Sequence, residues 1–165
     1  MSPLGKRRRF LLRSLWFLLF DSPQSHPRCF SVAVWAGWLW SGRVIVVIAD
    51  DISGAAELAG IAFERGLSAE VQTCFDPTST ADVVALDTDS RLATPAVAAR
   101  RVGEMARHVA AANPSLIYKK VDSVLRGAIV AEIDAILEST GRTQALLVPA
   151  NPSRRRLIKV GEYFV

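Results

Sequence analysis

Cysteine is nearly absent from this chain of 165 residues, which holds only Cys29 and Cys74. Two cysteines supply neither a disulfide framework nor the ligands of a zinc site. We therefore expect a reducing compartment and a cytoplasmic protein. The sequence also contains no internal repeat and no low-complexity tract, and its length is that of about one domain.

An excess of basic charge is missing from most of the chain, although the whole carries a formal net charge of +4. Residues 1–43 hold seven Lys or Arg and one acidic residue. Residues 44–165 hold 13 basic and 15 acidic residues, so this part has a net charge of −2. Because it also lacks a sustained basic stripe, we expect no nucleic-acid partner.

Residues 1–42 differ in composition from the rest, since they contain all four tryptophans and the basic run at residues 6–9. We interpret this atypical basic, Trp-rich segment as an extension outside the fold, or as the product of a start site placed too early. A signal peptide is an alternative, but Arg13 interrupts the apolar stretch and no A-x-A site follows. A membrane span over residues 29–49 would consume a predicted strand, so we expect no membrane partner.

From Arg43 onward, strands alternate with helices. The expected strands are residues 43–49, 68–75, 82–87, 115–120 and 144–150. Three helices are expected. The first is capped by Ser53 and turns one apolar face inward, formed by Ala55, Leu58, Ala59, Ala62 and Phe63. The second begins at Thr94 and Pro95, and the third covers residues 127–140. This order predicts an α/β fold with an open, mainly parallel, Rossmann-like sheet and flanking helices. The apolar run at residues 161–165 has the character of a strand just starting, so we expect the domain to be truncated there.

Polar clusters follow the predicted strands, and ligands of an open parallel sheet bind at the carboxyl ends of its strands. The clusters are residues 50–54, then Asp87, Asp89, Ser90 and Arg91, then Lys119, Lys120, Asp122, Ser123 and Arg126, and last residues 151–156. Arginine presents a planar fork to a carboxylate, and aspartate accepts hydrogen bonds from sugar hydroxyls or takes a hydroxyl proton. Gly54 lets an anion approach the start of a helix. We expect a site for a small polyhydroxylated anion at this edge.

Each cluster also has a structural interpretation that stays open. The pairs Asp50-Asp51 and Asp122-Ser123 are typical helix caps. Residues 154–156 are typical of a solvated loop. Adjacent strand residues point to opposite faces, so one of the two lysines at 119–120 is expected to be solvated. We expect His108 to be solvated and not a base.

Four stretches carry a resemblance to a known family: IADDISGAAELAGIAFERGL, ALDTDSR, IYKKVDSVLRG and LLVPANPS with VGEYFV. Over about residues 43–165 the chain resembles the N-terminal domain of the four-carbon acid sugar kinases, which phosphorylate threonate, erythronate or 2-oxo relatives with ATP. The resemblance implies that this domain holds the sugar acid and that a second domain, missing or separate here, holds ATP with Mg²⁺. It implies a substrate pocket formed by Asp50, Asp51, Arg91, Lys120, Asp122, Ser123 and Arg126. Asp51 or Asp122 is the candidate base, with a base in the missing domain as the alternative, and no metal site is expected.

The chain departs from the family pattern at several positions. Ser53 replaces a usual threonine, Val124 and Ala128 replace frequent polar residues, and Arg155 replaces a usual glycine. No G-x-x-x-x-G-K-[ST] phosphate loop occurs. We expect the chain to bind a sugar acid weakly, to bind neither ATP nor Mg²⁺, and to transfer no phosphate alone.

Two alternative functions remain. The first is a non-catalytic sugar-acid-binding remnant. The second is a Mg²⁺-dependent phosphohydrolase with an aspartate nucleophile. For this class, Asp87 and Asp89 have the required D-x-D spacing, but Arg91 stands where a threonine or valine is usual.

Overall fold

The computed structural model describes residues 44–164. The predictions made for residues 1–42 therefore lie outside the described residues. In chain order the elements are β1 (Ile45–Ala49), α1 (Ile52–Glu64), β2 (Ala69–Gln72), β3 (Val83–Asp87), α2 (Pro95–Ala111), β4 (Leu116–Lys120), α3 (Ile129–Thr140), the 3-10 helix η1 (Pro152–Arg154), β5 (Leu157–Lys159) and β6 (Glu162–Phe164). No helix among the described residues is long and apolar enough to cross a membrane.

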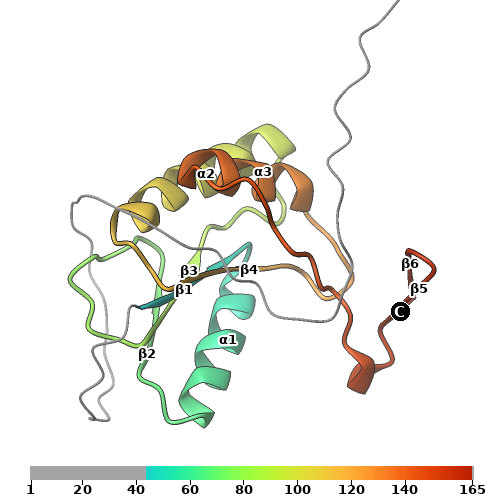
Figure 1. Cartoon of the computed structure of the whole chain (residues 1–165), viewed down its shortest axis with the longest axis horizontal. Coiled ribbons are helices and arrows are strands. Elements are labelled where there is room, and N and C mark those ends of the chain that lie inside the picture. The colour runs from blue at the N-terminus through green and yellow to red at the C-terminus, as the bar shows by residue number, and fades with distance from the viewer. Residues whose placement is uncertain (1–43, 165) are drawn as a thin grey trace, which may run out of the picture.

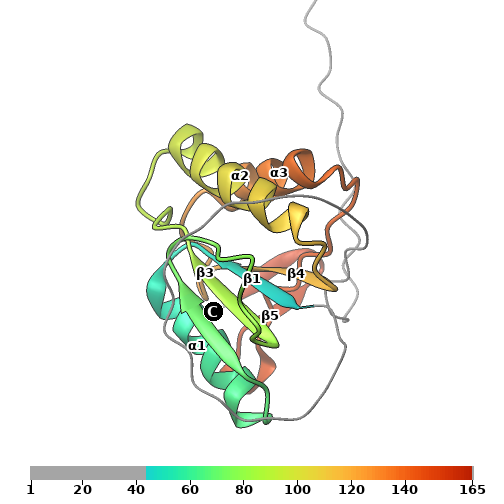
Figure 2. The ribbon, with the colours of Figure 1, turned by 90° about the vertical axis from the view of Figure 1, so that its left-hand side faces the viewer.

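Four strands form one parallel sheet in the order β2-β3-β1-β4, which confirms the predicted α/β fold. In the ladder, Ala49 at the end of β1 lies beside Asp87 of β3 and Lys120 of β4. The carboxyl ends of three strands therefore meet at one edge. Helices α2 and α3 cover one face of the sheet and α1 the other (Figures 1 and 2).

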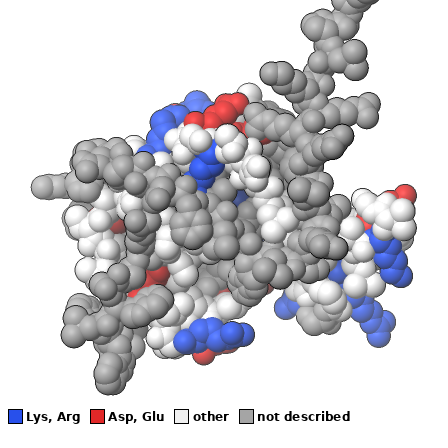
Figure 3. Space-filling model, viewed as in Figure 1, with Lys and Arg blue, Asp and Glu red and all other residues white. Residues whose placement is uncertain are grey.

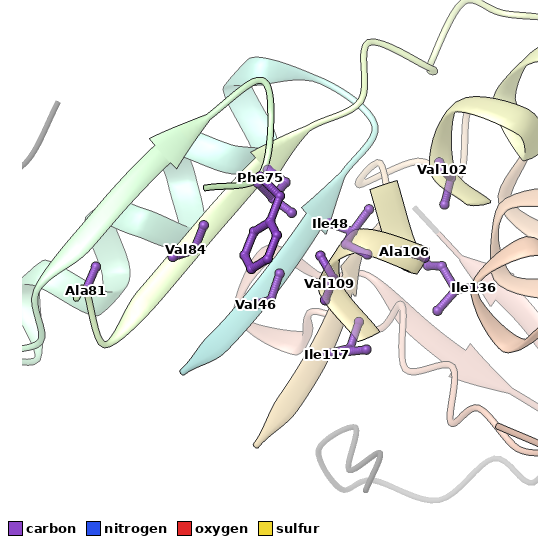
Figure 4. Packing of buried hydrophobic residues seen from close by; sticks show 11 residues of the cluster. Val46, Ile48, Phe75, Ala81, Val84, Val102, Ala106, Val109, Ile117 and Ile136 are labelled. Atoms are coloured by element: carbon purple, nitrogen blue, oxygen red, sulfur yellow. The ribbon is translucent and has the colours of Figure 1, made fainter. Parts of the chain in front are cut away.

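The core lies on both faces of the sheet, as the continuous β-branched runs predict. On one face, Ile48 of β1 packs with Val102 of α2 and Ile136 of α3, all at most 3% exposed (Figure 4). On the other face, small alanines let α1 approach β1 and β3 closely. Phe63 was predicted to face this core but is 62% exposed, because the buried stripe of α1 is narrower than expected.

The helix ends follow the predicted signals with two exceptions, of which one is that α3 begins at Ile129 and not at residue 127. Asp51, and not Ser53, is the N-cap of α1, because its carboxylate accepts a hydrogen bond from the amide of Gly54 at 2.8 Å. Gly66 and Gly141 stop α1 and α3 in the left-handed conformation, with φ of 78° and 68°. The prediction for Ser53 was therefore wrong by two residues.

The prediction of a fifth strand at residues 144–150 was also wrong. These residues have no ladder partner, and the chain leads instead to an antiparallel hairpin in which Leu157 of β5 pairs with Phe164 of β6 (Figure 1). The expected strand at the end of the chain is thus present as β6. An apolar run is compatible with a strand, but only a neighbouring strand makes it one.

Arg155 follows η1 with φ of 59° and ψ of 18°, a conformation that disfavours side chains with a Cβ. We expect Arg155→Gly to raise the free energy of unfolding by about 1 kcal/mol, because glycine adopts this backbone without steric cost. Urea denaturation measures the change. The matched control is Arg154→Gly, which falls inside η1 and should not stabilise. Equal effects of both substitutions would contradict the prediction.

Candidate functional site

Three loops meet at the carboxyl ends of the central strands, where the polar clusters were predicted to gather. Asp50 follows β1, Arg91 lies four residues after β3, and Asp122 lies two residues after β4. The backbone amides of Ser90 and Arg91 both donate to the carbonyl of Asp50 at 3.0 Å. The parallel register therefore brings together side chains that are more than 70 residues apart in sequence.

Arg91 is the centre of the site. Its Nε and one terminal nitrogen donate to the two carboxylate oxygens of Asp50 at 2.9 and 2.8 Å, a bidentate pair. Its terminal nitrogens also donate to Asp51 at 2.6 and 2.8 Å, and one lies 3.6 Å from Asp122. The hydrogen bond to Asp50, together with the negative charges of all three aspartates, raises the pKa of Arg91 above its usual value.

Asp122 is held in its own loop rather than at the start of a helix. Its Oδ2 accepts hydrogen bonds from the amide of Val124 at 3.0 Å and from the amide and Nε of Arg126 at 3.2 and 3.0 Å, while Oδ1 accepts from a terminal nitrogen of Arg126 at 2.7 Å. The side-chain hydrogen bond from Arg126 is the main reason that the pKa of Asp122 lies well below its usual range. The carboxylate is 4% exposed.

Two glycines permit the close approach of these loops. A Cβ on Gly54 would lie 2.9 Å from Oδ1 of Asp51 and 3.2 Å from Cγ of Lys120. Gly127 has φ of 89°, and a Cβ there would lie 3.5 Å from Oδ2 of Asp50. The amide of Gly54 donates to Asp51, so this amide already has an acceptor within the protein.

The two lysines of β4 point to opposite faces, as predicted, but neither is solvated. Nζ of Lys120 lies 3.1 Å from Oε2 of Glu57, on the face that α1 covers, and its side chain is 14% exposed. Nζ of Lys119 lies 3.0 Å from Oε2 of Glu132, on the other face, and its side chain is 5% exposed. The expectation of a solvated lysine was wrong, because each nitrogen lies beside a carboxylate from a helix that packs on its face of the sheet. His108 is exposed, as predicted.

A cavity of about 810 Å³ opens beside the cluster. Six of the seven residues predicted for the substrate pocket line it: Asp51, Arg91, Lys120, Asp122, Ser123 and Arg126. The seventh, Asp50, lies behind Arg91 and is only 2% exposed. Arg154 and Arg156 also line it, whereas Arg155 between them does not. Basic side chains gather over this C-terminal segment (Figure 3).

Two residues of the site escaped the sequence interpretation. Glu57 lies one turn beyond the start of α1 and lines the cavity as the partner of Lys120. Tyr163 of β6 donates from its hydroxyl to the carbonyls of Ser123 and Pro149 at 2.9 and 3.3 Å, which links the hairpin to the loop after β4. Glu57 is six residues after Asp51, and this spacing indicates a position near the edge of the sheet where the strands end. Nothing in the sequence indicates the contact of Tyr163.

The aspartates of the phosphohydrolase alternative point elsewhere. Asp89 is 89% exposed on its side chain and pairs with Arg101 of α2 at 2.7 Å. Neither Asp87 nor Asp89 lines the cavity. Within residues 44–164, moreover, no group of three or more His, Cys, Asp or Glu side chains is placed to hold a metal ion.

Fold and site together define an α/β domain whose charged side chains gather at the carboxyl ends of its strands, where ligands of open parallel sheets bind. The family model described as "Sugar-binding N-terminal domain" matches residues 45–165. The chain belongs to this family.

Curated relatives carry the names of sugar-acid kinases. The chain is 38% identical over 127 residues to the D-erythronate kinase of Heliobacterium modesticaldum, covering 73% of this chain and 29% of that protein. It is 36% identical over 132 residues to the D-threonate kinase of Bordetella bronchiseptica, covering 75% of this chain and 33% of that protein. The chain therefore spans about a third of the length of these relatives.

A solved structure shares the fold. It is a domain of unknown function from Bordetella bronchiseptica, described as a domain-swapped dimer with bound citrate. The TM-score is 0.54 at 33% identity, and the match covers 58% of this chain and 25% of that one. A second crystal form of the same protein gives a TM-score of 0.55 at 35% identity, with 60% of this chain and 27% of that one covered.

Proposed function

We propose that this domain binds a four-carbon sugar acid of the threonate or erythronate type and forms the substrate half of an ATP-dependent kinase. The observation that carries the proposal is the cluster of three aspartates around Arg91, two of which line a cavity that extends from the strand ends along the sheet to Ile45 and Leu116. Carboxylates fixed in this way accept hydrogen bonds from vicinal hydroxyls. The names of the relatives support a substrate with the same chemistry.

The balance of charge suggests how the substrate is oriented. Arg91, Lys120 and Arg126 already pair with carboxylates of the protein. Among the described residues that line the cavity, Arg65, Arg154 and Arg156 have no such partner. Arg65 is the C-cap of α1, at the end of that helix away from Asp51, so it is not placed to share a ligand with the aspartates. We therefore assign the carboxylate of the sugar acid to Arg154 and Arg156, and its hydroxyls to Asp51 and Asp122, which also line the cavity.

Asp51 is the better candidate for the base that takes the proton of the reacting hydroxyl. Asp122 accepts four hydrogen bonds within its own loop, and its lowered pKa makes it a weak proton acceptor at neutral pH. Asp51 lines the cavity with a side chain that is 25% exposed. It lies beside Arg91, which would hold it in position.

The described residues do not fit ATP or Mg²⁺. Residues 44–164 contain no cluster of metal ligands, and the sequence contains no phosphate loop of the G-x-x-x-x-G-K-[ST] type. We propose that a separate domain holds the nucleotide and that this chain alone transfers no phosphate. In this proposal the sugar-acid domain spans residues 43–165, residues 1–42 lie outside it, and the protein acts in the cytoplasm.

Calorimetric titration of the purified chain with D-threonate and D-erythronate tests the assignment. We expect binding that weakens at least tenfold in Arg156→Gln, because the substrate carboxylate loses its partner. Arg155→Gln is the matched control and should bind as the wild type does, since Arg155 does not line the cavity.

Several outcomes would contradict the proposal. Unchanged affinity in Arg156→Gln would refute the assigned orientation. Tight binding of succinate, which lacks hydroxyls, would show that the protein does not recognise the hydroxyls of the sugar acid. Turnover of ATP with D-threonate by the chain alone would refute the separate nucleotide domain. A Mg²⁺-dependent phosphatase activity that disappears in Asp87→Asn would instead support the phosphohydrolase.

A further inference from the structure

A buried polar network lies beneath the site and takes no part in lining the cavity. Its side chains come from the loop after β3, from β4 and from α3. They are Thr88, Ser90, Lys119 and Glu132, which are 7%, 0%, 6% and 1% exposed. Burial of a lysine and a glutamate to this degree is rare unless the two are paired.

The contacts of the network form one continuous chain. Nζ of Lys119 lies 3.0 Å from Oε2 of Glu132, and the hydroxyl of Ser90 donates to Oε1 of the same carboxylate. The hydroxyls of Thr88 and Ser90 are 2.8 Å apart. Ser90 gives its one proton to Glu132, and the hydroxyl of Thr88 donates to the carbonyl of Ala49 at 2.8 Å. The same carbonyl accepts the amide of Thr88 at 3.0 Å.

The network is joined to the site at two points. Ser90 precedes Arg91, and the amides of both residues donate to the carbonyl of Asp50. Nζ of Lys119 also donates to the carbonyl of Lys120 at 3.0 Å, two residues before Asp122. Two of the three loops of the site, those after β3 and β4, are therefore connected to the single carboxylate of Glu132.

Stability alone is a poor explanation for such a pair. The desolvation of two buried charges offsets most of their attraction, and apolar residues of similar size often stabilise a fold equally well. What the pair adds is a defined geometry, since the carboxylate of Glu132 must face Lys119 and Ser90 at once. A defined position of Ser90 is what Arg91 requires to reach three aspartates.

We propose that Glu132 and Lys119 are positioning residues, which hold Ser90 so that Arg91 stays in its bidentate contact with Asp50. Neither residue touches the ligand in this assignment. The proposal rests on the proposed function only for the identity of that ligand. The expected consequence of losing the pair is a mobile Arg91 in a protein that remains folded.

The primary test is the solvent exchange of the Arg91 Nε proton, measured by NMR on the full chain. We expect exchange at least tenfold faster in Glu132→Gln, which leaves Lys119 without a countercharge. The double variant Glu132→Gln/Lys119→Met removes both charges and should show the same acceleration even if the single variant fails to fold. The matched control is Ile136→Val, a core substitution one turn further along α3 that should lower the melting temperature without changing this exchange rate.

The outcomes separate positioning from a structural role. Slow exchange in the double variant, despite a lower melting temperature, would overturn the proposal, as would fast exchange already present in the wild type. A second measurement is the affinity for D-threonate, which should fall at least tenfold in the double variant and stay unchanged in Ile136→Val. If the wild type does not bind D-threonate, the proposed function fails, while the exchange of the Arg91 proton still decides whether the pair is a positioning device.

Discussion

Replacing Arg91 by methionine is expected to lower the free energy of unfolding by about 4 kcal/mol. The guanidinium is the shared partner of three aspartates, and Asp50 among them is 2% exposed. Removing one partner of a buried charge pair costs about 3–5 kcal/mol, because the remaining charge stays in a region of low polarity without compensation. In this case the remaining carboxylates also repel one another.

Urea denaturation at neutral pH measures the loss. The matched control is Arg100→Met on α2, since Arg100 is 64% exposed and its contact with Glu104 is 3.8 Å long. An exposed pair of this kind contributes about 0–1 kcal/mol. Adding Asp50→Asn to Arg91→Met should recover part of the lost stability, because it removes the buried charge. A loss below about 1 kcal/mol in Arg91→Met would show that the cluster does not hold the strand ends together.

Asp122→Asn is expected to lower the free energy of unfolding by about 2–3 kcal/mol at neutral pH, in line with the loss of hydrogen bonds to a charged group. The pKa of Asp122 in the folded state lies well below its usual value. A depressed pKa stabilises the folded state at pH values above the unfolded pKa of about 4, and this contribution is lost as the pH falls further. The difference between wild type and Asp122→Asn should therefore be constant from pH 7 to about pH 5 and shrink below about pH 4.

Thermal unfolding at a series of pH values checks this dependence. Asp89→Asn is the matched control, because Asp89 has a side chain that is 89% exposed and pairs only with Arg101 among the charged groups described. This variant should differ little from the wild type at any pH. If the stability difference between wild type and Asp122→Asn grew as the pH fell, the prediction would be refuted. The ionised carboxylate of Asp122 would then not be what stabilises the folded state.

Much of the fold could be predicted from local patterns. The β-branched run at residues 45–49 predicted a strand buried on both faces, and Gly66 and Gly141 marked the helix ends. The alternation of strands and helices predicted the parallel sheet. Because parallel strands end at one edge, the sequence also predicted that Asp51, Arg91 and Asp122 lie together.

Two of the errors concern contacts between different elements of the fold. Residues 144–150 have the composition of a strand, but no neighbouring strand pairs with them. One of the two lysines at 119–120 was expected to be solvated. Lys119 is instead buried, with its ammonium group paired to Glu132 of α3. The cap of α1 is a local matter: Asp51, which the sequence also indicated as a cap, accepts from Gly54 in place of Ser53.

The sequence by itself determined the class of fold, the edge of the sheet where the polar clusters gather and the kinds of side chain that meet there. These follow from periodicity, caps and the direction of parallel strands, which depend on nearby residues. Only the tertiary structure decided which charges neutralise one another, so that Arg91, Lys120 and Arg126 are paired while Arg154 and Arg156 face the cavity without a carboxylate among the described residues. Pairing depends on distances of a few ångströms between loops, and strand direction alone does not set such distances.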